Sequence, residues 1–217
     1  MACTEKKQDF IALAEALTNT PWCDDYEKMI SGMFYDSFVP ELVEGRLRAR
    51  KLVKKYNDYL PDDATNESLN KDREIMLKEF IGRVGKGVCI DPPFRVDYGC
   101  NIIIGDEFYA NFNMVILDCA IVKIGDRVKF GPNVSVFAAI HPTEVQARRE
   151  TPDYSKEVTI GNDCWIGGHT VIMPGVTIGD GVTIGASSVV TRGIPSYSIA
   201  LGSPARVIKR VESVDMR

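Results

Sequence analysis

The sequence predicts a mainly β fold, a triangular parallel β-helix of about five coils with an N-terminal α-helical module. Two observations carry this prediction. Apolar residues recur three and four positions apart in the first 81 residues, whereas after Val84 they recur every six residues. The 217 residues, 45% of them apolar, suit a folded, elongated unit with an appendage. We divide the chain into 1–23, an N-terminal extension; 24–81, the helical module; 82–195, the β-helix with a loop at 142–159; and 196–217, a C-terminal cap.

Three helices are expected before the six-residue repeat begins. The second starts at Pro40, a residue type that suits the first position of a helix. The basic residues between Arg46 and Lys55 are interpreted as a solvated helix face. The apolar positions at helical spacing are Phe10, Leu13, Ala14 and Leu17 in the first helix, Leu42, Val43, Leu47, Leu52 and Val53 in the second, and Leu69, Ile75, Met76, Phe80 and Ile81 in the third.

Fifteen six-residue units follow, interrupted by two pairs of extra residues and by one long excursion. Every unit begins with an apolar residue, thirteen of the fifteen being Val or Ile, and eight have Gly in second position. We interpret each unit as a short strand that points its first side chain inward, with a sharp bend at the second position. Three units make a coil, and stacked coils satisfy each other's backbone groups. Cys100 and Cys164, at fifth positions, are expected to fill the core.

Composition excludes several classes of function. The 26 basic and 30 acidic residues give a net charge of −4, which argues against nucleic acid as the main ligand. No apolar run approaches the roughly 20 residues of a membrane helix, and the N-terminus lacks a signal-peptide layout, so we expect a cytoplasmic protein that binds no membrane. The six cysteines form no C-x-x-C pair. With His141 and His169 as the two histidines, a three-histidine zinc site cannot form within one chain, and we expect neither a metal nor a bound cofactor.

His141 is the candidate general base. It closes the third coil, immediately before Pro142 and the long excursion in the repeat. Long loops in compact folds usually serve a function, and a histidine at such a point can accept a proton at neutral pH. His169 stands in the fourth position of a regular unit, where we expect a solvated surface residue.

Polar or aromatic side chains at three further points suggest a ligand. Asp91, Asp97 and Asn111 occupy second positions, although each could serve there only as a turn former. Asn111 lies in the stretch Tyr-Ala-Asn-Phe-Asn, whose aromatic and amide groups suit a sugar. Trp165 stands at an outward position, where burial in the coil cannot explain it. It therefore indicates either a ligand or a neighbouring subunit.

The chain resembles the hexapeptide-repeat acyltransferases, and among them the maltose and galactoside O-acetyltransferase group. The matching stretches lie between residues 24 and 211 and are K-M-I-S-G-M-F-Y-D, R-L-R-A-R-K-L, F-R-V-D-Y-G-C-N-I, F-Y-A-N-F-N, I-L-D, H-P, W-I-G-G, P-G-V-T-I-G and G-S-P-A-R-V-I. The resemblance implies a left-handed β-helix, acetyl-CoA as cosubstrate, a small sugar acceptor, and a homotrimer with its sites between subunits.

The resemblance also implies roles for particular residues. His141 would be the catalytic base, and Asn111 would hold the acceptor and the reacting centre. Arg206 and Lys209 have the cationic side chains that CoA phosphates require. The implied acceptor-binding residues are Asp36, Asp97, Tyr109 and Asn111, and the implied CoA-binding residues are Trp165, Gly168, Ala186, Thr191, Arg192, Arg206 and Lys209.

One departure from the family pattern bears on the acceptor. Asp118 is followed by Cys119, whereas the galactoside branch has a second acidic residue there. The maltose branch has an apolar residue at that point and an Asp at the position of Asp97, which favours maltose or glucose as acceptor. The effect of Cys119 stays open, and residues 1–23 receive no function. Two alternatives remain: a transferase of the same superfamily with a non-sugar acceptor, such as serine or an antibiotic, and a non-catalytic β-helix assembly subunit.

Overall fold

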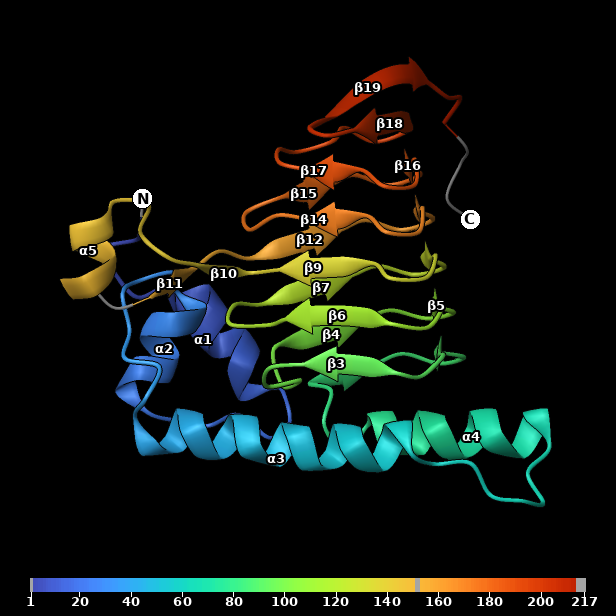
Figure 1. The fold of residues 1–217 in the computed structure, drawn as a ribbon, viewed down its shortest axis with the longest axis horizontal. Helices are drawn as coiled ribbons and strands as arrows, with labels where there is room; N and C mark the ends of the chain where they lie inside the picture. Colours follow the sequence, from blue (N-terminus) through green and yellow to red (C-terminus); the bar gives the residue numbers. More distant parts are fainter. Residues whose placement is uncertain (1, 151–152, 214–217) are drawn as a thin grey trace.

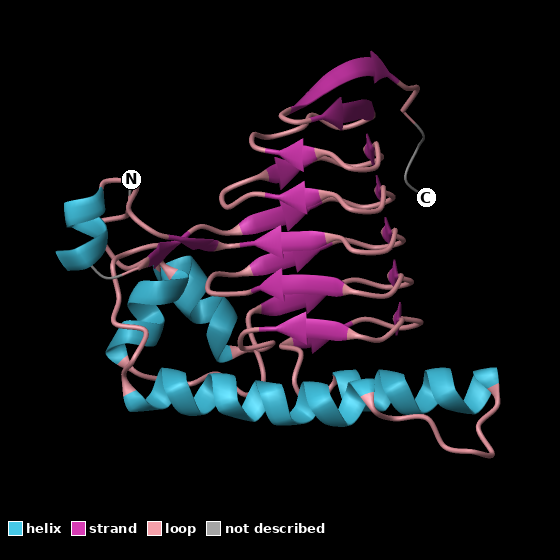
Figure 2. Cartoon of the chain, in the orientation of Figure 1, coloured by secondary structure: helices cyan, strands magenta, loops and turns pink. Residues whose placement is uncertain are grey.

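A triangular β-solenoid stands on a layer of helices in the computed structural model, which describes residues 2–150 and 153–213 (Figures 1 and 2). The helical module and the β-helix predicted from the sequence are both present. The helices are α1 (Gln8–Glu15), α2 (Asp24–Ile30), α3 (Pro40–Asn57), α4 (Asn66–Leu77) and α5 (Val145–Glu150).

Three parallel sheets form the sides of the left-handed solenoid, and we call them sheets I, II and III. Sheet I contains β1 (Arg83–Val84), β4 (Ile102–Ile104), β7 (Val122–Ile124), β12 (Val158–Ile160) and β15 (Thr177–Ile178). Sheet II contains β2 (Cys89–Ile90), β5 (Tyr109–Ala110), β8 (Lys129–Phe130), β13 (Trp165–Ile166), β16 (Thr183–Ile184), β18 (Ser198–Gly202) and the antiparallel β19 (Ala205–Arg210). Sheet III contains β3 (Phe94–Val96), β6 (Met114–Leu117), β9 (Ser135–Phe137), β14 (Val171–Ile172) and β17 (Val189–Val190). These strands make the five predicted coils.

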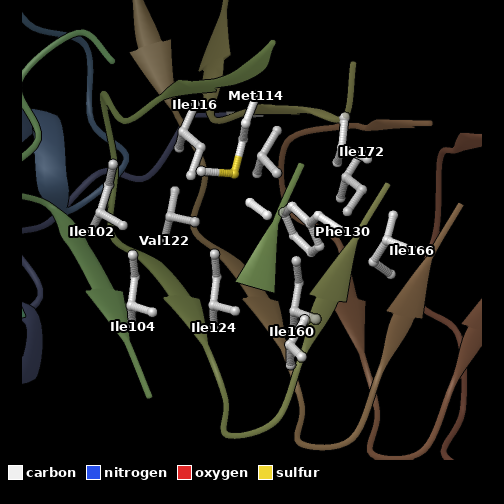
Figure 3. Packing of buried hydrophobic residues seen from close by; sticks show 14 of the residues in the cluster. Ile102, Ile104, Met114, Ile116, Val122, Ile124, Phe130, Ile160, Ile166 and Ile172 are labelled. Carbon is white, nitrogen blue, oxygen red and sulfur yellow. The ribbon is translucent and has the colours of Figure 1, made fainter. Parts of the chain in front are cut away.

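Branched aliphatic side chains fill the solenoid in columns that run along its axis. Ile104, Ile124 and Ile160 pair with one another across successive strands of sheet I, and all three are buried. Figure 3 shows this column and its counterparts pointing into the shared interior. Phe130 is 1% exposed and packs edge-on against Phe108, with ring centroids 5.2 Å apart. The first residue of each repeat therefore supplies the core, as the periodicity predicts.

At eleven of the fifteen repeats the left-handed bend lies at the fourth position, so the predicted bend at the second position is wrong. A Cβ on Gly105 would lie 2.3 Å from the Asp126 side chain, and one on Gly125 would lie 2.4 Å from Asn162. Glycine is needed at second positions because the neighbouring coil approaches closely, and not because of backbone curvature. The residues with positive φ at fourth positions are Gly87, Gly99, Glu107, Asn113, Arg127, Asn133, Asp163, His169, Gly175, Gly181 and Ser187.

A ladder of side chains joins successive coils at the corner between sheets I and II. The carboxylate of Asp126 accepts a hydrogen bond from the backbone amide of Asp106, and Asn162 accepts one in the same way from Asp126, both at 2.8 Å. Asp180 and the Ser196 hydroxyl extend the ladder. The third position of the repeat is thus polar at this corner because it satisfies backbone amides of the adjacent coil.

Each end of the solenoid is covered. At the N-terminal end, α3 and α4 cross beneath the first coil (Figure 1), where Tyr56 and Leu77 join the solenoid core. The Tyr56 hydroxyl donates to the carbonyl of Ile90 at 2.6 Å. At the other end, Ile194 bridges to Ile178 and β18 pairs with β16, so the tail begins a sixth coil before β19 folds back on β18.

A second core lies beside the solenoid, between its first two coils and the helices α1 and α2. Ala14 of α1 and Met29 of α2 are fully buried in it. Cys100 belongs to this second core, whereas Cys164 lies in the solenoid interior. The prediction that both cysteines fill a core is therefore correct, although Cys100 packs against the helices and not inside the coil.

The predicted loop after the third coil is a hairpin. The strands β10 (Ala139–Ile140) and β11 (Tyr154–Ser155) pair antiparallel and carry α5 between them. The hairpin projects from the solenoid towards α1 and α2 (Figure 1). The hydroxyl of Ser155 donates to the carbonyl of Met29 at 2.6 Å, which ties the hairpin to α2.

We expect the Phe130→Ala variant to lose about 3–5 kcal/mol of unfolding free energy, because the change leaves a cavity between stacked coils. Guanidinium unfolding followed by circular dichroism measures this loss. Phe38→Ala is the matched control, since the Phe38 side chain is 82% exposed and its loss should change stability by no more than about 0.5 kcal/mol. Equal losses in the two variants would contradict the packing described here.

Candidate functional site

His141 is held by a carboxylate that the sequence analysis did not identify. The hairpin register pairs Ile140 with Tyr154, which places His141 opposite Asp153. The Nδ1 atom of His141 lies 2.5 Å from Oδ1 of Asp153. The backbone carbonyl of Asp153 accepts a hydrogen bond from the amide of Tyr35, which fixes the carboxylate against the helical module. Nothing in the sequence indicated that Ala139–Ile140 pairs with Tyr154–Ser155, and this pairing is what brings Asp153 to the histidine.

The geometry prepares His141 to accept a proton. A carboxylate at Nδ1 favours the tautomer that carries its hydrogen there and leaves Nε2 unprotonated. The His141 side chain is 64% exposed, so a substrate can reach Nε2. The same carboxylate stabilises the positive charge that the ring acquires on protonation. His141 and Asp153 therefore form an oriented base with an open face.

Asp97 lies near this base and has a partly buried carboxyl group. It follows β3 at the corner between sheets III and I, and its Oδ2 lies 3.5 Å from the Sγ of Cys119. Burial raises the pKa of Asp97, while Arg46 and Arg50 oppose this shift through their charges. Cys119 is 8% exposed, and its thiol lies between the Asp97 carboxyl group and the Tyr35 side chain, with which it also interacts.

Asp118 organises the backbone beneath Asp97. Its side chain is fully buried and accepts hydrogen bonds from the amides of Asp97 (3.1 Å), Tyr98 (2.9 Å) and Asn101 (3.3 Å). Burial raises the pKa of Asp118 to about 7, and the charge of Asp97 adds to the shift, although the amides of Tyr98 and Asn101 oppose it. The Tyr26 hydroxyl donates to the Asn101 side chain at 2.9 Å and links the network to α2.

Asp36 belongs to the same edge of the molecule. It is adjacent to Tyr35, whose amide binds the carbonyl of Asp153. Its side chain is exposed, and Oδ1 accepts a hydrogen bond from the amide of Phe38 at 2.8 Å. The structure thus brings Asp36, Asp97 and His141 to one edge, which we call the base edge.

Asn111, Tyr109 and Trp165 lie at the opposite edge of sheet III, where sheet II turns into sheet III. We call this corner the amide edge. Asn111 follows β5, and its Oδ1 accepts a hydrogen bond from the amide of Phe112 at 2.8 Å. The Tyr109 hydroxyl donates to Asp91 at 2.9 Å. Trp165 is 59% exposed on β13, and in the register of sheet II it lies between Lys129 and Thr183 of the neighbouring strands.

Two backbone amides on the amide edge are free to bind a ligand. Gly168 follows β13 and Ala186 follows β16, so they stand one coil apart in the same column. In the stretches 2–150 and 153–213, the amides of Gly168 and Ala186 donate no hydrogen bond, whereas the neighbouring amides of Gly167 and His169 do. Such a pair can bind two carbonyl oxygens of an extended ligand.

The two residues expected to be catalytic do not meet within one chain. Asn111 lies where sheet III begins, and His141 lies beyond the point where it ends. Between them, the four residues of β6 (Met114–Leu117) alone span about 10 Å at 3.3 Å per residue. Figure 1 shows the same separation, with β5 on one side of the sheet III strands and β10 on the other. Within one chain, His141 and Asn111 therefore lie at opposite edges of sheet III.

The remaining CoA candidates lie towards the C-terminal end. Thr191 and Arg192 are exposed after β17, on the same corner of the solenoid as the base edge. Arg206 and Lys209 are exposed on β19. The described part of the chain contains no group of three or more His, Cys, Asp or Glu residues arranged to hold a metal ion. Among the helices described, none is long and apolar enough to span a membrane.

Comparison with protein families gives two matches. Residues 28–85 match the maltose acetyltransferase hexapeptide capping motif, and residues 157–192 match the bacterial transferase hexapeptide of six repeats. The capping motif covers α3 and α4, the helices that close the first coil.

Relatives of known name cover most of the chain. Galactoside O-acetyltransferase from Escherichia coli is 41% identical over 87% of this chain and 90% of its own length. The crystal structure of a maltose O-acetyltransferase from Clostridium difficile superposes with a TM-score of 0.83 at 41% identity, over 88% of this chain and 99% of that one. A hexapeptide-repeat acetyltransferase from Vibrio cholerae, complexed with acetyl-CoA, gives a TM-score of 0.79 at 32% identity, over 88% of this chain and all of that one.

The raised pKa of Asp118 predicts a pH-dependent contribution to stability. Between about pH 4 and pH 7 the folded chain keeps a proton on Asp118 that the unfolded chain has released, so the contribution falls as the pH rises. We expect the unfolding free energy of the wild type minus that of Asp118→Asn to decrease over this range and to level off above pH 7. Denaturant unfolding at several pH values measures it, and parallel curves for the two proteins would contradict the prediction.

Proposed function

The chain belongs to the hexapeptide-repeat acetyltransferases, in the group of maltose and galactoside O-acetyltransferases that use acetyl-CoA, and on that premise we propose that it acetylates a sugar hydroxyl with His141 as general base. The observation that carries the proposal is the contact between His141 and Asp153, which leaves Nε2 open on the exposed face of the ring. The preferred acceptor is a maltose- or glucose-type sugar.

The proposed reaction moves one proton and one acyl group. Nε2 of His141 takes the proton of the acceptor hydroxyl as the hydroxyl oxygen attacks the carbonyl carbon of the thioester. The carbonyl oxygen becomes an oxyanion, to which the free amide of Gly168 donates a hydrogen bond. The carbon–sulfur bond then breaks, and the imidazolium returns its proton to the CoA thiolate. Asp153 stabilises the imidazolium between these two steps.

The CoA arm is proposed to follow the amide edge towards the C-terminal end. The Gly168 and Ala186 amides stand one coil apart along this path, as the spaced carbonyls of a pantetheine arm require. The exposed Trp165 ring offers an apolar surface beside them. The exposed residues Arg206 and Lys209 lie towards that end, where their cationic groups suit the nucleotide phosphates. Thr191 and Arg192 lie at the C-terminal end of the base edge, which the trimer proposed below would bring beside the amide edge of the next subunit.

The acceptor is proposed to lie between the two edges. Asp36 and Asp97 provide carboxylates for sugar hydroxyls on the base edge, and Tyr109 and Asn111 provide hydroxyl and amide groups on the amide edge. Carboxylates accept two hydrogen bonds each and an amide both donates and accepts, which matches adjacent hydroxyls on a sugar ring. Cys119, whose thiol contacts both Asp97 and Tyr35, is proposed to support the Asp97 carboxyl group.

A homotrimer would complete each site. The outward side chains of sheet III are largely apolar, in contrast to the mixed polar residues on the outer faces of sheets I and II. A threefold arrangement that turns sheet III towards its neighbours would cover this surface and place the base edge of one subunit beside the amide edge of the next. The outward residues of sheet III are Arg95, Val115, Leu117, Ser135, Phe137, Val171 and Val189.

We expect His141→Ala to lower turnover by about 100- to 10,000-fold, because the acceptor hydroxyl loses its base, while CoA binding is kept. Release of the CoA thiol with maltose and glucose as acceptors measures turnover, and calorimetric titration with CoA measures binding. Turnover near that of the wild type would remove the proposed mechanism.

Asp153→Asn serves as the companion variant. The imidazole remains but loses its oriented tautomer and the stabilisation of its charge, so we expect a turnover reduced by about 10- to 100-fold with an unchanged KM for acetyl-CoA.

Mixing two inactive variants tests whether the sites are shared. In randomly reassembled trimers of His141→Ala and Asn111→Ala chains, about one site in four should combine an intact His141 with an intact Asn111 from the neighbour. We expect activity to rise from near zero to about a quarter of the wild-type value after joint dissociation and reassembly. The same variants mixed without dissociation are the control. An absence of recovery in trimers verified to be mixed would overturn the shared site.

A further inference from the structure

A groove of about 720 Å³ lies beneath the first coil, next to the proposed acceptor position, and has no role in the reaction described above. Its walls come from α3 on one side and from the Pro92–Pro93 corner and β3 on the other. It ends at Val96, the residue before Asp97. The lining residues that the argument uses are Arg50, Lys54, Asp58 and Arg95.

The groove is basic within an acidic chain. Arg50, Lys54 and Arg95 carry three positive charges and Asp58 one negative charge, so the lining has a net charge of about +2 at neutral pH, whereas the whole chain has −4. Lys54 and Asp58 form an ion pair with each other. Within the described stretches, neither Arg50 nor Arg95 has a carboxylate within ion-pair distance, and two guanidinium groups are left for a ligand.

Arg50 and Arg95 lie close enough to Asp97 for one substituted sugar to contact all three residues. Arg95 lies on β3 and Asp97 is the first residue after that strand, so their Cα atoms are about 7 Å apart. Arg50 is close enough to Asp97 to lower the pKa of its carboxyl group through its charge. A ligand whose hydroxyls bind Asp97 therefore places its adjoining substituent between Arg50 and Arg95.

From this geometry we propose that the groove extends the acceptor site and selects sugars that carry an anionic group, a phosphate ester or a carboxylate, bound by Arg50 and Arg95. Paired guanidinium groups provide the planar donors that recognise such anions. The groove also has room for the substituent. Asn57 keeps its wall in place, because its side chain donates to the carbonyl of Phe94 and accepts from the amide of Phe94, each at 2.9 Å. The inference rests on the proposed acetyl transfer to a sugar hydroxyl.

The kinetic test compares matched neutral and anionic acceptors. With acetyl-CoA, we expect kcat/KM for glucose 6-phosphate and galacturonate to exceed that for glucose and galactose by about 10-fold or more, and the advantage to shrink at high salt. The double variant Arg50→Gln/Arg95→Gln should lower the ratio of anionic to neutral kcat/KM by about 10- to 100-fold.

Arg83→Gln is the control, because Arg83 is exposed on the sheet I side of the same coil and its loss changes the net charge without touching the groove. Equal kcat/KM values for neutral and anionic acceptors, or a ratio unchanged in the double variant, would overturn the proposal.

Direct binding separates this inference from the proposed function. Calorimetric titration of the wild type with glucose 6-phosphate should show binding that the double variant loses and Arg83→Gln keeps. If no sugar is acetylated yet this pattern holds, the acetyl-transfer proposal fails and the anion-selective groove stands. If neutral sugars are acetylated and glucose 6-phosphate does not bind through the arginines, the groove proposal fails alone. Binding of inorganic phosphate as tight as that of glucose 6-phosphate would show a simple anion site and overturn the acceptor assignment.

Discussion

Hydrogen bonding between successive coils is the constraint from which the rest of this structure follows. Each coil has unpaired backbone groups on two sides, and only another coil or a cap can satisfy them. Ladders such as the one from Asp106 to Asp180 hold the spacing fixed, and the glycines at second positions allow that spacing at the corner. The helices α3 and α4 end the stack on one side and β18 with β19 end it on the other, because an open coil would leave its backbone exposed.

The same constraint determines where chemistry can be placed. The sides of the solenoid are flat, so functional groups gather at corners and in the hairpin that leaves one of them. His141 depends on that hairpin twice, because its antiparallel register brings Asp153 to the imidazole and the bond from Tyr35 fixes the hairpin against the helical module. The width of sheet III then separates this base from Asn111 and the free amides. The proposed division of the site between two chains rests on this separation.

The helical module takes part in the site as well as in the fold. Its α3 helix covers the end of the core through Tyr56 and forms one wall of the basic groove through Arg50. The loop before α3 carries Asp36 to the base edge, and α2 is tied to the Asp118 network by Tyr26. A single arrangement of helices therefore closes the solenoid, supports the carboxylates proposed to bind the acceptor and leaves a charged groove beside them.

The sequence by itself determined the solenoid, because a six-residue period of inward aliphatics such as Ile104 and Ile124 is a local pattern that only this architecture explains. It also singled out His141, since a lone histidine before a long interruption is visible without coordinates. It placed the bend at the wrong position, because the close approach of Gly105 to the next coil is a contact between distant residues. Only the tertiary structure decided that Asp153 meets His141 and that Asn111 does not. The first result depends on the register of the hairpin and the second on the width of sheet III, and both are relations between distant residues that exist only in the folded chain.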